Sequence, residues 1–291
     1  MPNDVITPPG QRSESRNPTT SPSRWRLLGL PVDRVDMDAA TQVVVALIER
    51  TRRERGARSG HSTSGDCPTI QQIVTLNPEM VMSARKDASL RDVIQRRAAL
   101  VTPDGVGLVW ASRLLGGGLT QRVAGVDLIE RLAPIAAERG YRLFLVGAGR
   151  GVATEAARGL RARSPGLLIA GVHDGSSSES DADAILAAIQ DAQPDLICVA
   201  FGSPAQELWL ANHSQQLGAV VAIGVGGAFD FIAGAVKRAP GWMRTLGLEW
   251  LYRLVRQPWR WRRMLALPRF VGAVLGEWVR AWPRPRMNVG A

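Results

Sequence analysis

The sequence of 291 residues has few cysteines and few histidines. Its two cysteines, Cys67 and Cys198, stand far apart, and its three histidines show no metal-ligand spacing. Small secreted domains depend on several disulfides, and structural zinc sites need several Cys or His ligands at short spacings. The sequence therefore argues against both, and a reducing cytoplasm is the expected compartment.

Long apolar runs are also missing. Residues 1–24 are rich in Pro, Ser, Thr and Asn and lack the apolar centre of a secretory signal, so we expect a disordered tail. The most apolar late segment, residues 264–282, is interrupted by one proline and three charged residues. A helix that spans a bilayer needs ~20 predominantly apolar residues. We therefore expect a chain that lies on a membrane without crossing it.

Acidic residues are scarce in the last part of the chain. Residues 237–291 hold 12 Lys and Arg against Glu249 and Glu277, and six of the nine tryptophans. The preceding 236 residues are neutral, with 24 basic and 24 acidic side chains. Basic side chains interleaved with tryptophan fit a membrane surface, a polyphosphate ligand or a nucleic acid. The neutral remainder argues against a general nucleic-acid binder.

The middle of the chain alternates apolar strand-like runs with amphipathic segments. The strands are expected at residues 72–76, 98–101, 142–146, 167–172, 196–200 and 219–223. The helices are expected at residues 78–86, 107–114, 127–139, 152–163, 181–192 and 204–217. This alternation predicts an α/β domain with a doubly wound, largely parallel, Rossmann-like sheet over residues 25–236.

Three further elements complete the prediction. A short strand pair at residues 25–32 leads into a helix at 39–53, and a polar Gly/Ser-rich flexible loop follows at 54–69. Beyond Lys237 the strand signal stops, and the pattern predicts short helices separated by prolines. Residues 237–291 are therefore expected to form a helical, basic C-terminal appendage.

The segment around Asp104 combines a strand end with a tight turn. Residues 98–101 are apolar, Pro103 fixes its own backbone angle, and Gly105 permits left-handed angles. Ligands bind at the carboxyl ends of parallel strands, so Asp104 is a candidate general base. The alternative is that Asp104 caps the helix that follows.

Three more polar residues stand at predicted strand ends. Thr75 and Asn77 lie two residues apart, so they face one side of an extended chain, and neighbouring parallel strands would bring them to Asp104. A helix cap is the alternative role for Asn77, and a strand-forming role is the alternative for Thr75. Gln206, at the start of a predicted helix, could hydrogen-bond a sugar or a base.

Two familiar patterns favour structural interpretations. The Gly-rich turn at residues 147–151 follows a strand, but its spacing departs from that of a dinucleotide site. The Asp-x-Asp strings at 36–38 and 181–183 could hold a divalent metal, yet both precede helices, where acids favour the helix dipole. Without a metal, the counter-charge for a diphosphate would have to come from Lys or Arg.

The appendage supplies such charges. Arg253, Arg256, Arg260 and Arg263 recur at spacings that would align them on one face of a continuous helix. Pro258 interrupts that helix, so the alignment requires a mild kink or two joined helices. The tryptophans between these arginines favour an interface over a solvated face.

Taken in order, seven motifs resemble those of the WecG/TagA/CpsF glycosyltransferases (glycosyltransferase family 26). The resemblance covers residues 25–270 and lies in Thr75-x-Asn77, Pro103-Asp104-Gly105, Arg122-Val123-Ala124-Gly125-Val126-Asp127, Gly202-Ser203-Pro204-Ala205-Gln206-Glu207, Gly224-Val225-Gly226-Gly227-Ala228-Phe229-Asp230, Lys237-Arg238-Ala239-Pro240 and Leu248-Glu249-Trp250-Leu251-Tyr252-Arg253-Leu254. Seven motifs in a fixed order are far more specific than any one of them.

The resemblance implies an inverting, metal-independent transferase without a cofactor, acting between a UDP-sugar donor and a polyprenyl-diphosphate-linked acceptor. It implies that Asp104 is the catalytic base with Thr75 beside it. It also implies that the substrate-binding residues are Asn77, Gln206, Arg253, Arg260 and Arg263.

The resemblance further implies a peripheral protein on the cytoplasmic face of the plasma membrane, working in surface polysaccharide or wall polymer synthesis. Its oligomeric state is left open, a homo-oligomer included. Two other functions remain as alternatives: a nucleotide-binding oxidoreductase using the Gly147 turn, and a non-enzymatic protein that binds membrane surfaces.

Overall fold

A computed structural model describes residues 22–58, 69–245, 247–258 and 261–281. Its centre is a six-stranded sheet in which all neighbouring strands of the described residues pair in parallel. In sheet order β4-β3-β8-β7-β5-β6, the strands are Ala98–Pro103, Gln71–Leu76, Val221–Gly224, Leu196–Ala200, Arg142–Gly147 and Leu168–His173. The prediction of a doubly wound α/β domain is confirmed.

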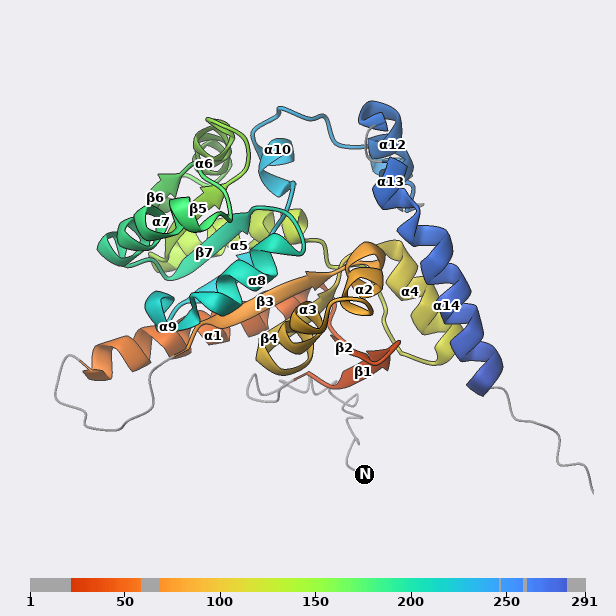
Figure 1. Ribbon diagram of the computed structural model, residues 1–291. Coiled ribbons are helices and arrows are strands. Elements are labelled where there is room, and N and C mark those ends of the chain that lie inside the picture. The colour runs from red at the N-terminus through yellow and green to blue at the C-terminus, as the bar shows by residue number, and fades with distance from the viewer. Residues whose placement is uncertain (1–21, 59–68, 246, 259–260, 282–291) are drawn as a thin grey trace, which may run out of the picture.

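Helices cover both faces of this sheet (Figure 1). They are α1 (Met37–Arg58), α2 (Pro78–Ala84), α3 (Ala88–Asp92), α4 (Val106–Leu115), α5 (Gly125–Arg139), α6 (Val152–Arg163), α7 (Glu179–Ala192), α8 (Ala205–Asn212), α9 (Ser214–Leu217) and α10 (Ala228–Ile232), with a π-helix at Val93–Arg97.

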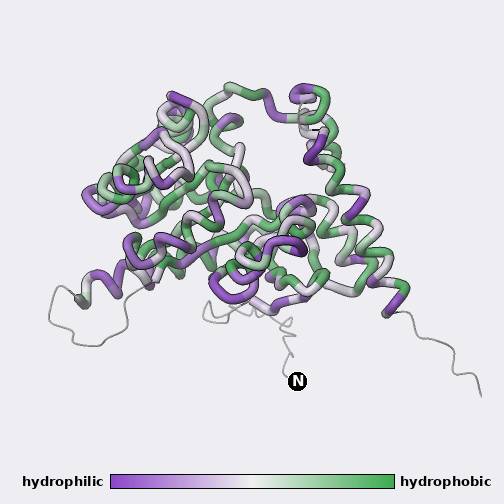
Figure 2. The backbone as a smooth tube through the Cα atoms, in the orientation of Figure 1, coloured by the Kyte–Doolittle hydropathy of each residue, from purple (hydrophilic) through white to green (hydrophobic). Residues whose placement is uncertain are grey.

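Alternate residues of β3, β4, β5, β7 and β8 reach opposite cores. Ile73 of β3 packs in a cluster with side chains of α1, α5, α6 and α10. The next residue, Val74, packs in a second cluster with α2, α3 and α4, and a third cluster joins β5, β7 and β8 to α7 and α8. A strand that is buried on both faces needs apolar residues at odd and at even positions. This explains why the predicted strands are continuous apolar runs. In Figure 2 these strands are mostly green.

The predicted strand pair is an antiparallel hairpin of β1 (Arg24–Leu27) and β2 (Leu30–Asp33). Asp33 is fully buried and accepts hydrogen bonds from Arg24 Nε at 2.7 Å and from Val101 N at 2.7 Å. Burial raises the pKa of the Asp33 carboxyl, and the hydrogen bonds from Val101 and Arg24 oppose that shift. Asp33 therefore ties the hairpin to β4.

Several predicted boundaries are wrong. The helix expected at 39–53 runs from Met37 to Arg58, so residues 54–58 of the expected loop are helical. Arg55 forms an ion pair with Asp195, next to the start of β7, which holds this last turn against the domain. Residues 59–68 of the loop and 1–21 of the predicted tail lie outside the described residues.

The helix predicted at 204–217 is also divided, because α8 and α9 meet at His213. The short α3 and the π-helix after it lie between the predicted elements at 78–86 and 98–101 and were not expected.

The appendage contains α11 (Gly241–Thr245), α12 (Glu249–Arg256), α13 (Trp261–Met264) and α14 (Ala266–Ala281). Helix α14 lies beside α2 and α4, as Figure 1 shows. The expectation of short helices ended by proline is wrong for α14, because Pro268 occupies its first turn, where a missing backbone N–H costs little. Among the described residues, no helix is long and apolar enough to cross a membrane.

Candidate active site

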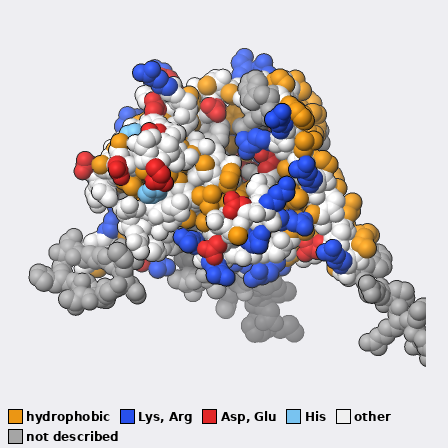
Figure 3. Space-filling view, in the orientation of Figure 1, with side chains coloured by type: hydrophobic (Ala, Val, Ile, Leu, Met, Phe, Trp, Pro, Cys, Tyr) orange, Lys and Arg blue, Asp and Glu red, His pale blue; other side chains and the backbone are white. Residues whose placement is uncertain are grey.

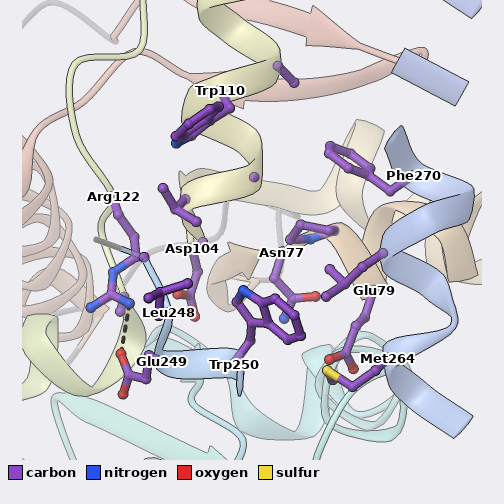
Figure 4. Close-up of a pocket in the computed structure, with 18 of the residues that line it drawn as sticks. Asn77, Glu79, Asp104, Trp110, Arg122, Leu248, Glu249, Trp250, Met264 and Phe270 are labelled. Carbon is purple, nitrogen blue, oxygen red and sulfur yellow. Dashed lines mark hydrogen bonds and ion pairs between the residues drawn. The ribbon is translucent and has the colours of Figure 1, made fainter. Parts of the chain in front are cut away.

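A cavity of about 800 Å³ opens at the carboxyl ends of β3, β4 and β8. The domain supplies its floor through the segments that follow these strands and through α4. The appendage supplies the opposite wall, with Leu248, Glu249, Trp250 and Met264 among its lining residues (Figure 4). The site is thus formed by segments that are far apart in the sequence.

Asp104 lies in this cavity directly after β4. Its backbone N–H donates to Leu76 O at 2.7 Å, which joins the ends of β3 and β4. The next residue, Gly105, has φ of +125° and occupies the N-cap position of α4. Gly105 rather than Asp104 is therefore the N-cap residue of α4.

Thr75 lies beside Thr102 in the β3–β4 register but does not line the cavity. Its side chain is buried, and Oγ1 donates to Gly224 O at 3.0 Å. The structure therefore brings Thr75 close to the strand end that carries Asp104, and its hydroxyl connects β3 to β8. No substrate contact of Thr75 follows from this geometry.

Asn77 does line the cavity. Its Oδ1 accepts a hydrogen bond from Met80 N at 2.9 Å, so the side chain also caps α2. In Figure 4 Asn77 and Asp104 lie near each other, between Arg122 and Glu79. The predicted meeting of Asn77 and Asp104 at one sheet edge is confirmed.

Gln206 lies behind the cavity wall rather than in it. Its Oε1 accepts from Gly202 N at 3.2 Å and from Gly226 N at 2.9 Å, and its Nε2 donates to Glu207 Oε1 at 2.7 Å. Because these contacts use both ends of the amide, Gln206 holds together the turns that follow β7 and β8. Direct binding of substrate by Gln206 has no support from this placement.

The predicted arginines are only partly described. Arg263 donates through Nε to Glu79 Oε2 at 3.0 Å, which joins α13 to α2 at the cavity edge. Arg260 and the side chain of Arg253 lie outside the described residues. Since α12 ends at Arg256 and α13 starts at Trp261, a single straight helix does not carry all of these arginines.

Arg122 also lines the cavity; it opens one of the seven family motifs, but the motif alone predicted no role for it. Its Nη1 donates to Glu249 Oε2 at 2.8 Å, and its Nη2 donates to Asp127 Oδ2 at 3.3 Å. Arg238 also pairs with Asp127, at 2.6 Å, and with Glu249, at 3.4 Å. We call Arg122, Asp127, Arg238 and Glu249 the ion-pair cluster. It connects α5 to the start of α12.

The ion-pair cluster keeps Arg122 charged beside Asp104. Burial lowers the pKa of Arg122, but the hydrogen bond to Glu249 and the charges of Asp104, Glu249 and Asp127 outweigh burial, so the pKa lies above its ordinary value. Sequence spacing alone offered no sign of this pairing, because Arg122 and Glu249 are 127 residues apart.

A second, smaller cavity of about 210 Å³ adjoins the first at Asn77 and Glu79. Its basic lining residues come from the turn after α2, from α13 and from α14: Lys86, Arg262, Arg263 and Arg269. Figure 3 shows Lys and Arg side chains gathered over this side of the molecule. The surroundings of the polar end of the site are therefore positively charged, as a phosphate-bearing substrate requires.

The other patterns have local roles. Asp36 accepts from Ala39 N at 2.8 Å at the start of α1, and Asp181 accepts from Ser176 N at 2.8 Å. Among the described residues, no group of three or more His, Cys, Asp or Glu side chains could hold a metal ion. A side chain at Gly147 would meet the Phe201 ring at 2.8 Å, so packing requires glycine in that turn.

Comparison with known proteins agrees with this geometry. Residues 25–284 match the glycosyl transferase WecG/TagA/CpsF family. An N-acetylglucosaminyldiphosphoundecaprenol N-acetyl-beta-D-mannosaminyltransferase of Bacillus subtilis (strain 168) is 40% identical over 205 residues, which are 70% of this chain and 79% of the relative. A Staphylococcus aureus (strain MW2) protein with the same name is 34% identical over 199 residues, which are 68% of this chain and 77% of the relative. This chain therefore belongs to the WecG/TagA/CpsF family of glycosyl transferases.

Proposed function

We propose that this glycosyltransferase moves a sugar from a UDP-sugar onto a polyprenyl-diphosphate-linked sugar, with inversion at the anomeric carbon. The names of the two relatives above favour N-acetylmannosamine as the transferred sugar and N-acetylglucosamine as the acceptor sugar. The uronic acid of N-acetylmannosamine and glucose remain the other donors to test. The product would enter surface polysaccharide or wall polymer synthesis.

One observation carries the proposal: Asp104 stands at a strand end inside a large cavity, next to the charged Arg122. In the proposed step, the Asp104 carboxylate takes the proton of the acceptor hydroxyl as that oxygen attacks the anomeric carbon. The new C–O bond forms while the bond to the UDP oxygen breaks, and UDP leaves with that electron pair. General-base assistance of this kind contributes roughly 10²–10⁴ in rate.

The departing diphosphate needs positive charge. Arg263 lines the smaller cavity that adjoins the site at Asn77 and Glu79, and we propose that Arg253 and Arg260 join it when both substrates are bound. Guanidinium groups bind phosphate oxygens through paired N–H donors, which suits a diphosphate without a metal ion. Asn77 would contact the sugar from the end of the neighbouring strand, whereas Thr75 and Gln206 would act by fixing the backbone around it.

We also propose that the protein works as a peripheral protein on the cytoplasmic side of the membrane. A polyprenyl chain keeps the acceptor in the bilayer, and the appendage offers exposed apolar side chains, among them Trp242 and Trp261, next to several arginines. Such a surface suits the boundary between lipid headgroups and acyl chains.

The test is a panel of UDP-sugars offered with undecaprenyl-diphosphate-N-acetylglucosamine, with product identified by mass spectrometry and stereochemistry by NMR. We expect transfer from UDP-N-acetylmannosamine, inversion, and full activity in the presence of EDTA. Absence of a disaccharide-lipid product from every donor would refute the proposal.

A further inference from the structure

We propose that the apolar half of the cavity, between α4 and α14, binds the isoprenoid chain of the lipid-linked acceptor. This inference rests on the proposed function, since it concerns the second substrate of the same site. We call this half the α4–α14 groove. Its side chains come from two helices and are Trp110, Ala111, Leu114, Leu267, Phe270, Val271, Val274 and Leu275.

The groove exposes more apolar surface than packing requires. Trp110 is 65% exposed, Leu114 40%, Val271 54% and Leu275 46%. Soluble proteins rarely leave large apolar side chains together in contact with water unless the surface binds something. Phe270 and Val274 are buried at the base, so the groove has an apolar floor as well as apolar rims.

The helices that form the groove approach one another closely at the end of the cavity that contains Asp104. Gly107 of α4 lies so close to α2 that a side chain there would meet Pro78 Cγ at 2.9 Å. The ring of Phe270 lies 3.7 Å from the same position, on the side of α14. Glycine at 107 therefore lets α2, α4 and α14 converge next to Asp104, and the groove leads directly to the proposed reaction centre.

The cavity has two chemically different ends. Asp104, Arg122 and Glu249 mark one end, whereas Trp110 and Phe270 lie apart from Glu249 in Figure 4. An amphipathic molecule with a charged head and a hydrocarbon tail matches this division. The acceptor class proposed above has that form, with a sugar diphosphate as head and a polyprenyl chain as tail.

The side chains that line the α4–α14 groove favour a hydrocarbon ligand over a peptide ligand. Apart from the indole N–H of Trp110, the groove side chains carry no polar atoms. A peptide placed there would lose water from its backbone N–H and C=O groups without replacement hydrogen bonds, which is costly. A hydrocarbon chain has no such groups and gains by leaving water.

The first test compares acceptors with one head group and different tails. Undecaprenyl and geranyl diphosphates, each bearing N-acetylglucosamine, are assayed in detergent without a bilayer, and the geranyl-to-undecaprenyl KM ratio is measured. For the unaltered protein we expect a ratio above about tenfold, because added hydrocarbon units gain binding energy in an apolar groove. Trp110→Ser, Leu114→Ser and Leu275→Ser should each lower that ratio severalfold.

Matched controls use equally exposed apolar residues outside the cavity. Val279 on α14 is 63% exposed and Leu168 on β6 is 48% exposed, and neither lines it. Val279→Ser and Leu168→Ser should leave the KM ratio unchanged. An unchanged ratio in the groove variants would overturn the inference, and so would an equal fall in the control variants, which would indicate general docking of the protein on micelles.

The second test does not depend on sugar transfer. A benzophenone-bearing polyprenyl diphosphate without a sugar is photolysed with the full-length protein, and the labelled peptides are identified. Label is expected in α4 and α14 and should be displaced by undecaprenyl diphosphate. Label elsewhere, or equal displacement by phosphatidylglycerol alone, would contradict the groove. Failure of transfer with every donor despite correct labelling would instead refute the proposed function.

Discussion

The α/β domain and the appendage are stabilised in different ways. Every residue of β7 and β8 is buried, and the strands are joined by parallel hydrogen-bond ladders. In the described part of the appendage only Ala239, Phe270 and Val274 are buried apolar residues, and nine of the twelve exposed large apolar residues lie there. Apolar burial is the main source of folding free energy, so the domain holds most of it.

A few specific contacts hold the appendage in place. Glu249 joins the ion-pair cluster, Arg263 pairs with Glu79, and Glu277 Oε2 accepts from Leu28 N at 3.1 Å. The comparison shows that Asp104, the proposed base, follows a strand of the buried sheet, whereas the opposite wall of its cavity is held largely by charge pairing. Changes in the two regions should therefore have separable effects on activity and stability.

The largest effect is expected in the domain, from Asp104→Asn. The amide cannot accept the acceptor proton, so kcat should fall by roughly 10²–10⁴. The thermal unfolding temperature should change little, because the substitution conserves shape. Asp38→Asn is the matched control, since Asp38 is an exposed carboxylate on α1 paired with Arg131. Near-normal turnover by Asp104→Asn would show that another group is the base.

The next effect is expected at the junction of the two regions, from Glu249→Gln. Loss of this carboxylate leaves Asp127 as the one cluster carboxylate shared by Arg122 and Arg238, and charge-assisted hydrogen bonds contribute about 1.5–3 kcal/mol each. We expect kcat/KM to fall about tenfold or more, in proportion to the lost interaction. Glu54→Gln, which removes a carboxylate from an exposed ion pair with Arg50, is the control.

The alkylation rate of Cys198 shows whether Glu249→Gln also destabilises the sheet of the α/β domain. Its thiol is fully buried in β7, and burial raises its pKa to about 12. In a Cys67→Ser background, alkylation of Cys198 should stay slow in the Glu249→Gln variant, because only the appendage contacts have changed. Rapid alkylation would mean that the ion-pair cluster also stabilises the sheet, and the two regions would not be separable.

A smaller effect is expected from paired glycine substitutions. A side chain at Gly224 would meet Gln206 Nε2 at 2.5 Å and Glu207 Oε1 at 2.8 Å, both buried behind the cavity. Gly224→Ala should lower the free energy of unfolding by about 1–3 kcal/mol. Gly272→Ala on α14, with no atom within 4 Å, should raise it by up to about 1 kcal/mol. Urea denaturation measures both, and similar losses would contradict the packing difference.

The smallest effect is a pH dependence from Glu207. This carboxyl is fully buried, and burial raises its pKa, with the hydrogen bond from Gln206 opposing. The folded protein therefore favours the protonated form, and its stability should decrease as pH rises above the ordinary pKa of 4.5 towards the folded value. The slope is at most about 1.4 kcal/mol per pH unit. Glu207→Gln should abolish this slope in urea denaturation at a series of pH values.

Much of the domain could be predicted because its signals are local. The apolar runs of the six strands and the helical periodicity between them give the parallel sheet directly. The turn at Pro103, Asp104 and Gly105 also depends on the residues themselves, since backbone angles are set by each residue and its neighbours. Family motifs then singled out Asp104 and Asn77, which the structure brings to one cavity.

Other roles depend on which surfaces meet, and no local pattern contains that information. Gln206 looked like a ligand-binding residue, but its amide bridges two turns that are neighbours only because β7 pairs with β8. The pairing of Arg122 with Glu249 likewise requires the appendage to pack against α5. Local backbone preferences thus determined the strand ends and the position of Asp104, whereas tertiary packing decided the ion-pair cluster, the course of α14 through Pro268 and the groove beside α4.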